Sequence, residues 1–304
     1  MENNYVQVLD HGFVGLVDHM GDDNSIVQAA RVSYGAGTKT VNTDRNLIRY
    51  LMRHKHTTPF EMCEVKFHLK LPIFIMRQLV RHRTASINEY SGRYSVMSDE
   101  FYLPEKAQVC AQSTTNKQGR ENELNDDQKL TIQNQTQAIF DDATKTYHEF
   151  IEDYDYSREL ARTVLPVSNY TECYWKANLK NFFHMVGLRA DSHAQWEIQE
   201  YANAMYNMVK PLFPEACQAW EDYHRDAVTF SGAEWHFIQE WIIGDMSKSD
   251  TFDEIIIDGT WDKLENKEDL KAQLRQAEKI ICEEYNLSKR EFTEMKNKIL
   301  NYAY

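Results

Sequence analysis

The chain passes directly from a strand pattern into an apolar helix pattern near residue 72. From Cys63 to Leu71, apolar residues alternate with polar or charged ones, which is the period of a strand with one buried face. The following residues, Pro72 to Val80, are apolar nearly all round and predict a buried helix with Pro72 at its first position. Because the strand feeds straight into the helix, both segments must reach the interior of the protein.

Polar and basic residues follow this helix at once. The segment Gln78 to Ser95 reads Q-L-V-R-H-R-T-A-S-I-N-E-Y-S-G-R-Y-S, with Arg81, His82, Arg83 and Arg93 among Ser86, Asn88, Ser91 and Ser95. Gln78 and Arg81 share one helical face, because they are three residues apart. A guanidinium at the end of a buried helix needs an acceptor, and its planar fork suits phosphate or carboxylate. We interpret the segment as an anion-binding pocket; the alternative is a set of solvated surface arginines.

The same segment resembles the signature of the flavin-dependent thymidylate synthases, which is R-H-R, seven residues, then S (Arg81 to Arg83, then Ser91). The longer pattern R-H-R-x-x-S-x-N-E-x-S-x-R-Y is similar to that family throughout, and matching segments span residues 20–230. The resemblance implies an α+β fold with a mixed or antiparallel sheet flanked by long helices. It also implies an enzyme that reductively methylates dUMP to dTMP, as a homotetramer with active sites at subunit interfaces.

A second segment, His54 to Glu61, is similar to the H-x-T-P-F-E segment of that family. The resemblance implies that His56 and Thr58 contact the flavin, with Glu61 in support. Two alternatives stay open on the residues alone. The segment could be a simple capped turn, or a metal site built from His54, His56 and Glu61, although H-x-H without a third ligand at helical spacing is a weak signal.

A third segment contains L-R-x-x-x-H-A-Q-W-E-I at residues 188–198, which resembles the second signature of the family. The resemblance implies that Arg189 contacts the pyrimidine and favours its N3-deprotonated form, since a close cation lowers the pKa of such a group by roughly one to three units. The alternative for Arg189 is a salt bridge to Asp191 or Glu197. For His193 and Glu197, four residues apart, we prefer an intrahelical pair to a pair of metal ligands.

The resemblance assigns the remaining site residues. For dUMP it implies the set Gln78, Arg81, Glu89, Ser91, Gly92, Arg93, Arg162 and Arg189. For FAD it implies His56, Thr58, Arg81, His82, Arg83, Glu89, Asn178, Leu179, Lys180 and His184, the last of which stands where many relatives have Asn. No metal is expected.

The reaction must activate C5 of the pyrimidine. Cysteine-based thymidylate synthases use a thiolate in a Pro-Cys context, and no Pro-Cys dipeptide occurs here. Ser91 is the one suggestively placed hydroxyl, but a serine nucleophile needs a base within hydrogen-bond reach. We therefore expect activation without an enzyme nucleophile, with Arg189 in the leading role. The resemblance implies NADPH as reductant of the flavin and methylenetetrahydrofolate as carbon donor, and the lack of a Gly-x-Gly-x-x-Gly fingerprint agrees with a flavin held between subunits.

Net charge and cysteine content bear on the other possible functions and on the location of the protein in the cell. The formal net charge of −13 argues against broad nucleic-acid binding, and so against a phosphate-clamp regulator that uses Arg81, Arg83 and Arg93. A metal-dependent hydrolase built on His54, His56, His193 and Glu197 is the third hypothesis. Five scattered cysteines without a C-x-x-C motif, no signal pattern and no long apolar span predict a cytoplasmic protein that does not enter a membrane.

The rest of the chain divides near residue 230. Residues 5–18 are typical of strands, and residues 25–33, 42–54, 130–154, 174–189 and 193–209 are typical of helices. Residues 103–128 are typical of a loop or an excursion on the surface. We expect a catalytic domain over 1–230 and an appended region over 231–304. The latter contains an aromatic helix (Trp235 to Ile243), a strand-like segment (Phe252 to Ile257) and two charged helices, the last with a capping box of Ser288 and Glu291.

Overall fold

A computed structural model describes residues 4–32, 44–114, 119–243, 278, 281–283, 287 and 289–302. It divides the chain into two compact units, Met1–Arg225 and Asp226–Tyr304. The expected strand Phe252 to Ile257 and the cap residue Ser288 lie outside the described residues. Over the part of the chain that is described, no helix is both long enough and apolar enough to cross a bilayer.

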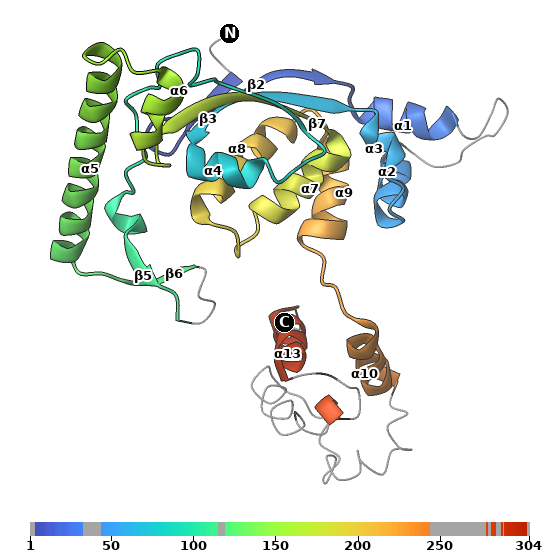
Figure 1. The fold of residues 1–304 in the computed structure, drawn as a ribbon. Coiled ribbons are helices and arrows are strands. Elements are labelled where there is room, and N and C mark those ends of the chain that lie inside the picture. Colours follow the sequence, from blue (N-terminus) through green and yellow to red (C-terminus); the bar gives the residue numbers. More distant parts are fainter. Residues whose placement is uncertain are drawn as a thin grey trace. The chain divides into compact units, whose positions relative to one another are not determined.

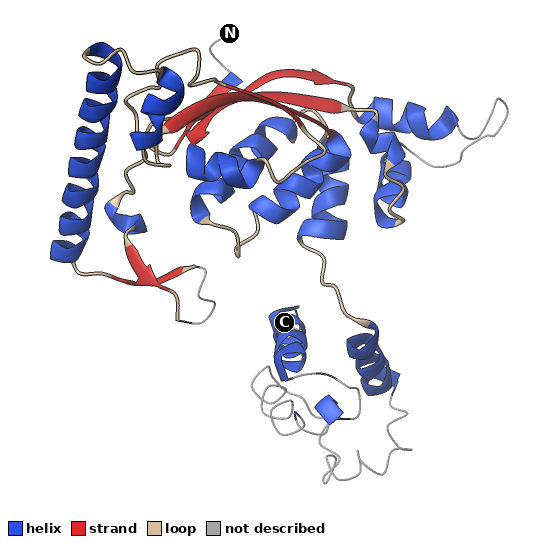
Figure 2. Cartoon of the chain, viewed as in Figure 1, coloured by secondary structure: helices blue, strands red, loops and turns tan. Residues whose placement is uncertain are grey.

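The first unit contains a five-stranded sheet. Its order is β1 (Tyr5–Val8), β2 (Gly12–Met20), β3 (Glu64–Pro72), β7 (Tyr170–Asn178) and β4 (Ser86–Glu89), and every neighbouring pair is antiparallel. The strands expected over 5–18 and 63–71 are confirmed. A separate two-stranded hairpin joins β5 (Cys110–Gln112) to β6 (Arg120–Glu123). With the helices described next, the fold is α+β, as expected (Figure 2).

Four helices cover one face of the sheet: α4 (Ile73–Leu79), α7 (Leu179–Arg189), α8 (Trp196–Val209) and α9 (Pro214–Trp220) (Figure 1). The reason is the alternation of β3, in which Val65, Phe67 and Leu69 have no exposed surface while the residues between them are partly exposed. Burying such a face against helices removes apolar surface from water at about 25 cal/mol per Å². The same face of β7 contributes the fully buried Trp175.

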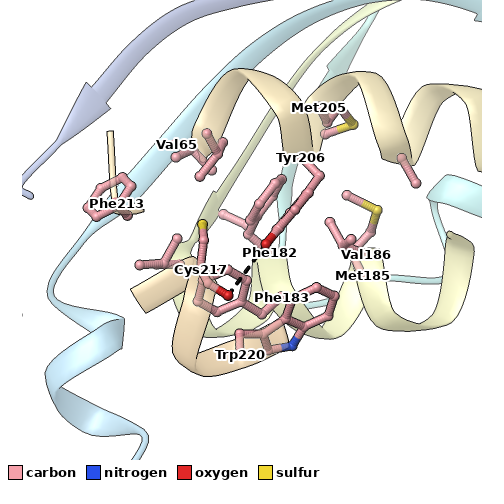
Figure 3. Close-up of a cluster of buried hydrophobic side chains, with 14 of the residues drawn as sticks. Val65, Phe182, Phe183, Met185, Val186, Met205, Tyr206, Phe213, Cys217 and Trp220 are labelled. Carbon is pink, nitrogen blue, oxygen red and sulfur yellow. Dashed lines mark hydrogen bonds between the residues drawn. The ribbon is translucent and has the colours of Figure 1, made fainter. Parts of the chain in front are cut away.

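Aromatic rings fix α7 within this core (Figure 3). Phe183 of α7 stacks on Trp220 of α9 with ring centroids 5.3 Å apart, and Phe182 stacks on Phe67 of β3 at 5.9 Å. Stacked pairs contribute about 0.5–1.5 kcal/mol each beyond the area they bury. These stacks hold the first half of α7 against the sheet and α9, and residues expected in the site lie at both ends of the helix.

The remaining elements complete the two units. In the first unit these are α1 (Asp23–Arg31), α2 (Asp44–Arg53), α3 (Thr58–Glu61), η3 (Lys106–Gln108), α5 (Asp126–Glu152), α6 (Arg158–Ala161), η4 (Arg162–Val164) and the π-helical turn η5 (Glu221–Arg225). The second unit contains α10 (Gly232–Ile243) and α13 (Lys289–Tyr302). The helices expected over 25–33, 42–54, 130–154, 193–209 and 235–243 are confirmed, with shifted ends.

Three local predictions are wrong. The segment 174–189 is not one helix, because β7 continues to Asn178, whose side chain accepts a hydrogen bond from the N–H of Asn181 and starts α7. The segment 103–128 is not a plain loop, since it contains η3 and the β5–β6 hairpin. Pro72 is the residue before α4, not its first residue.

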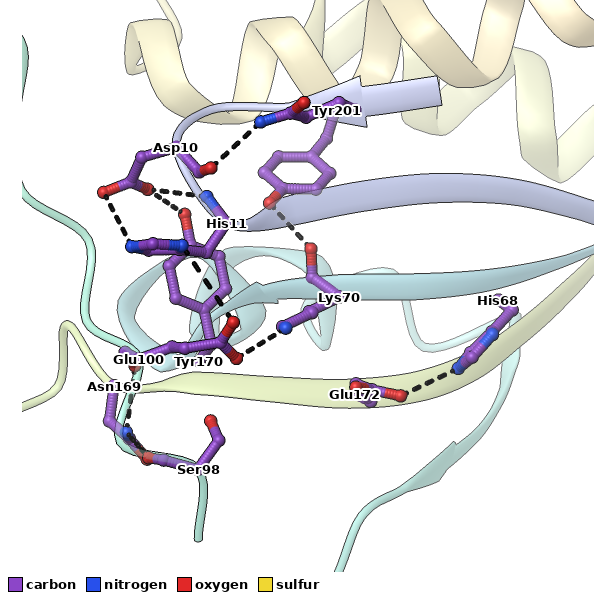
Figure 4. Close-up of polar contacts among 11 residues, drawn as sticks. Asp10, His11, His68, Lys70, Ser98, Glu100, Asn169, Tyr170, Glu172 and Tyr201 are labelled. Carbon is purple, nitrogen blue, oxygen red and sulfur yellow. Dashed lines mark hydrogen bonds and ion pairs between the residues drawn. The ribbon is translucent and has the colours of Figure 1, made fainter. Parts of the chain in front are cut away.

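A polar network ties the first turn of the chain to the segment that leads to the hairpin (Figure 4). Asp10 accepts hydrogen bonds from the hydroxyl of Tyr170 and, at 2.9 Å, from the N–H of Leu103. The hydroxyl of Tyr201 donates to the carbonyl of Lys70 at 2.7 Å. Buried polar groups stay stable only when they are paired in this way. The network thus holds the start of the 103–128 segment against the sheet and α8.

We expect Gly12→Ala to destabilise the first unit by about 1–3 kcal/mol, because a Cβ there would lie 1.9 Å from the Tyr201 hydroxyl and 2.6 Å from the carbonyl of Val8. Urea unfolding checks this prediction. Gly232→Ala is the control, since a Cβ at Gly232 meets nothing within 4 Å. An unfolding midpoint for Gly12→Ala equal to that of the unmodified protein would contradict the prediction.

Candidate active site

Arg189 lies at the end of α7 and is held by two hydrogen bonds. Its Nε donates to Nε2 of His82 at 2.9 Å, and its Nη2 donates to the carbonyl oxygen of Gln78 at 3.2 Å. The alternative of a salt bridge to Asp191 or Glu197 is wrong, because Asp191 accepts from His193 and Glu197 accepts from other side chains. The two bonds use two of the five N–H groups of the guanidinium.

Burial sets the protonation state of His82. The residue is 8% exposed, and burial, together with the charge of Arg189 and the neighbouring His184, lowers its pKa to about 4. His82 is therefore neutral at pH 7, and a neutral imidazole nitrogen can accept the proton of Arg189 Nε. Burial and the charge of Arg81 also lower the pKa of Arg189. These contacts bring Gln78, Arg81, His82 and Arg189 together, and we call these four residues the Arg189 group.

A cavity of about 760 Å³ opens beside this group, and we call it the Arg189 cavity. Its wall combines α4, the loop between α7 and α8, the start of α8 and the β5–β6 hairpin. The lining residues include two arginines, five glutamines and a tryptophan but no aspartate or glutamate: Gln78, Gln108, Gln112, Gly119, Arg120, Arg189, Ser192, His193, Ala194, Gln195, Trp196 and Gln199. Such a lining favours an anionic, hydrogen-bonding ligand. Sequence reasoning missed the hairpin residues, because nothing local marks them.

The other residues expected for dUMP form a second group around Gly92. The Cβ of any other residue at Gly92 would lie 3.1 Å from Cδ of Arg162 and 2.7 Å from Sδ of Met97, so glycine lets these side chains approach. Ser91 Oγ accepts from the N–H of Arg93 at 3.4 Å, and that bond supplies no base for a serine nucleophile. Arg93 pairs with Glu159 at 3.3 Å. Glu89, at the end of β4, accepts from Thr171 at 3.0 Å.

Three of the ten expected flavin residues line a second cavity of about 230 Å³, which we call the His56 cavity. His56, Lys180 and His184 line it, together with Lys55 and His224, which sequence reasoning did not single out. Its apolar wall is formed by Leu51, Met52, Phe60, Phe183 and Trp220, and none of the described residues that line it is acidic. Basic side chains around an aromatic wall fit an aromatic ring that carries phosphate groups.

Two further expected flavin residues have structural contacts in this chain, and two others are exposed. Asn178 caps α7 through its side chain. Leu179 is fully buried, and its N–H donates to the carbonyl of Cys63 at 2.8 Å. Thr58 begins α3 and is exposed, and Arg83 is exposed as well. The preceding residue, Thr57, lines the His56 cavity.

Histidines and carboxylates do not assemble as the metal hypothesis requires. Among the residues described by the structure, no group of three His, Cys, Asp or Glu side chains could hold a metal ion. The expected intrahelical pair of His193 and Glu197 is also wrong. His193 precedes α8 and bonds to Asp191, whereas Glu197 is buried and accepts from Tyr102 and Arg120.

Known proteins share both the sequence and the fold. The family model for thymidylate synthase complementing protein matches residues 15–215. The flavin-dependent thymidylate synthase of Gluconobacter oxydans is 49% identical over 244 residues, which cover 79% of this chain and 80% of that protein. The chain belongs to this family. The enzyme of the same name from Rickettsia bellii is 47% identical over 260 residues, covering 81% of this chain and 88% of that protein.

A solved structure agrees with the sequence comparisons. The UMP/dUMP methylase PolB from Streptomyces cacaoi, bound with 5-Br UMP, superposes with a TM-score of 0.65 at 32% identity, and covers 72% of this chain and 98% of that chain. The expected family, enzyme class and α+β fold are thereby confirmed. The family is flavin-dependent by name, so the chain is a flavin-dependent methylating enzyme.

We expect buried His82 to make folding stability depend on pH between about 4 and 6.5. Its pKa is lower in the folded chain than in the unfolded chain, so the unfolded state binds more protons in this window. Stability is fully present above pH 6.5 and falls as pH drops, by up to roughly 3 kcal/mol at 1.4 kcal/mol per pKa unit. Urea unfolding at several pH values measures the fall.

His82→Gln is the matched control, because the amide oxygen can still accept from Arg189 but does not titrate in this range. The free energy of unfolding of His82→Gln should therefore change less between pH 4 and pH 6.5 than that of the unmodified protein. Equal pH slopes for the two proteins, or an imidazole of His82 that titrates near 6.5 by NMR, would contradict the prediction.

Proposed function

We propose that this chain methylates dUMP to dTMP, with methylenetetrahydrofolate as carbon donor, and with FAD, reduced by NADPH, as hydride donor. The observation that carries the proposal is the Arg189 group, in which a fixed cation lines a cavity without acidic residues. The family relationship and the nucleotide-bound methylase structure support it.

Arg189 would stabilise the pyrimidine after it loses the N3 proton. The loss places negative charge on the ring, and a guanidinium within hydrogen-bond distance lowers the free energy of that anion. His82 and the Gln78 carbonyl hold the guanidinium in one orientation, so the cation does not have to reorganise as the charge develops. Electron density pushed into the ring activates C5 without an enzyme nucleophile.

Arginines and small residues would hold the rest of the nucleotide. Arg81, Arg93 and Arg162 suit the phosphate, because a guanidinium binds two phosphate oxygens at once. Gln78, Glu89, Ser91 and Gly92 would orient the sugar and base through neutral hydrogen bonds and close approach of the backbone. Arg93, now paired with exposed Glu159, would exchange that carboxylate for phosphate, since an exposed ion pair contributes only about 0–1 kcal/mol.

The His56 cavity fits the flavin by the chemistry of its wall. The residues that would hold FAD are His56, Thr58, Arg81, His82, Arg83, Glu89, Asn178, Leu179, Lys180 and His184, and the basic ones suit its diphosphate. When bound, FAD supplies the hydride that completes the methyl group, after reduction by NADPH. His184 lines the cavity, so the histidine present here can take the position where relatives have Asn.

We further propose a homotetramer whose active sites lie at subunit interfaces. The contacts of one chain gather the nucleotide residues into two groups, one around Arg189 and one around Gly92. Arg81, Arg93 and Arg162 are exposed in a single chain, and a partner would bury them. Residues 1–230 would form the catalytic domain, with 231–304 as an extension, in a protein of the cytoplasm that binds neither nucleic acid nor membrane.

Arg189→Ala should leave the flavin bound and lower the rate of dTMP formation about 100-fold or more, as expected when a charge-stabilising donor is removed. Flavin absorbance of the purified protein and dTMP formation measure the two effects. Arg31→Ala is the control, because Arg31 is paired with Asp44 in an exposed contact of α1. Undiminished dTMP formation in Arg189→Ala would show that another group stabilises the pyrimidine.

Mixing two inactive variants tests the shared active site. If each site takes Arg189 from one subunit and Arg162 from its partner, a mixed pair of Arg189→Ala and Arg162→Ala subunits contains one intact site. Random reassembly in equal amounts should then restore roughly a quarter of the activity. Arg189→Ala mixed with Gln78→Ala, both in the Arg189 group, should restore none. Failure of the first mixture, with tetramers formed, would refute the arrangement.

A further inference from the structure

Part of the Arg189 cavity has no assigned role. The dUMP proposal uses only Gln78 and Arg189 from its lining, whereas much of the wall comes from the β5–β6 hairpin and the start of α8. We call this part the hairpin wall; it consists of Gln108, Gln112, Arg120, Trp196 and Gln199. A cavity of about 760 Å³ lies in the range of roughly 300–1,000 Å³ typical of drug-sized ligands.

Arg120 is the centre of the hairpin wall. Its Nη1 donates to the carbonyl of Gln108 at 3.2 Å and to Oε1 of Glu197 at 3.1 Å. Glu197 is 2% exposed and also accepts from the hydroxyl of Tyr102 at 3.0 Å. The guanidinium carbon lies 5.6 Å from the ring centre of Trp196. Arg120 is therefore held against Trp196 and Glu197 at the start of α8, although Glu197 lies 77 residues further along the chain.

The same pair leaves two buried atoms without hydrogen bonds. Nη2 of Arg120 and Oε2 of Glu197 are both buried and have no partner in the described part of the chain. Leaving such an atom unpaired destabilises the fold, and the effect is larger for a charged group. Arg120 itself lines the cavity with a side chain that is 30% exposed, so an anionic ligand can approach the part of the guanidinium that is not buried.

The rest of the wall specifies the ligand class. The side-chain amide N–H₂ of Gln112 donates to the carbonyl of Gly119 at 3.0 Å, and that of Gln199 donates to the carbonyl of Ala194 at 2.7 Å. The amide nitrogen is the bonded atom in both glutamines, so the amide oxygen is the atom that can accept from an N–H group of a ligand. The indole of Trp196 adds an aromatic surface on which a flat ring can pack. Donors from Arg120 beside acceptors from glutamine match a ring edge with adjacent carbonyl and N–H groups.

We propose that the hairpin wall binds an anionic cosubstrate with a planar ring that carries a carbonyl and N–H groups on one edge. Methylenetetrahydrofolate has such a pterin edge and a glutamate tail, and NADPH has a carboxamide ring and phosphates. The inference rests on the proposed function, since it takes the cosubstrates of that reaction. Arg189 lines the same cavity, so a ligand on the hairpin wall lies beside the pyrimidine, where the carbon donor must deliver its carbon.

The test uses full-length protein loaded with FAD. Arg120→Gln removes the charge, Arg120→Lys retains the charge but not the planar fork, and Gln112→Ala removes an acceptor without touching the buried Glu197. Gln137→Ala is the control, because its amide bonds to Asp141 on α5. The KM values for methylenetetrahydrofolate, NADPH and dUMP are measured separately. Binding of tetrahydrofolate and of NADP⁺ is measured by calorimetry, independently of turnover.

We expect the KM and Kd of one of the two cosubstrates to rise tenfold or more in Arg120→Gln, less in Arg120→Lys, and several-fold in Gln112→Ala. The KM for dUMP should stay within twofold. A rise for the folate assigns the wall to the carbon donor, and a rise for the nicotinamide nucleotide assigns it to the hydride donor; both support the inference. Should Arg120→Gln fail to fold, Gln112→Ala carries the same test.

Two results would overturn the inference. One is unchanged binding of both cosubstrates in every folded variant, and the other is a rise in the KM for dUMP alone. Failure of the proposed function has a different signature, since the unmodified protein would then form no dTMP from dUMP and methylenetetrahydrofolate. The calorimetric values remain informative in that case, because they need no turnover.

Discussion

The contact between Arg189 and neutral His82 is the interaction on which the candidate site depends. An imidazolium in the same place would repel the guanidinium and could not accept its proton. Burial and the charge of Arg189 keep His82 uncharged at neutral pH, so the imidazole can accept the proton of Arg189 Nε there. The Gln78 carbonyl supplies the second acceptor. A cation held by two neutral acceptors keeps its net charge, which a salt bridge to Asp191 or Glu197 would have cancelled.

Helix α7 links this cation to the second cavity. Arg189 lies at its last residue, while Lys180 and His184, one turn apart on the same helix, line the His56 cavity. Phe182 and Phe183 between them are buried in aromatic stacks against β3 and α9. A rigid helix of 11 residues therefore sets the separation of the two cavities.

The local pattern of apolar and polar residues predicted much of the fold. It did not predict the parts of the structure that depend on contacts between residues far apart in the sequence. The alternation from Cys63 to Leu71 and the apolar run after it correctly gave β3 and α4, since both follow from burial of one chain segment at a time. The hairpin after residue 103 has little apolar periodicity. It is fixed instead by Arg120 on Glu197, 77 residues away. Likewise Arg189 and His82 are 107 residues apart. The motif resemblance named both residues but not their contact. The prediction of a helix from Tyr174 is wrong because pairing with β3 holds that segment as a strand.

The exposed arginines explain how a chain with a large negative net charge can bind an anionic nucleotide. The sequence suggested that arginines after a buried helix would be buried too, yet Arg81, Arg83, Arg93 and Arg162 are exposed in one chain. Left in water they need no buried acceptor, so the fold bears no desolvation cost before a ligand or partner arrives. The net charge of −13 repels polyanions at long range, whereas these local cations attract a small phosphate within roughly one Debye length of 8–10 Å. On the proposed function, this distribution of charge favours a mononucleotide over a nucleic acid.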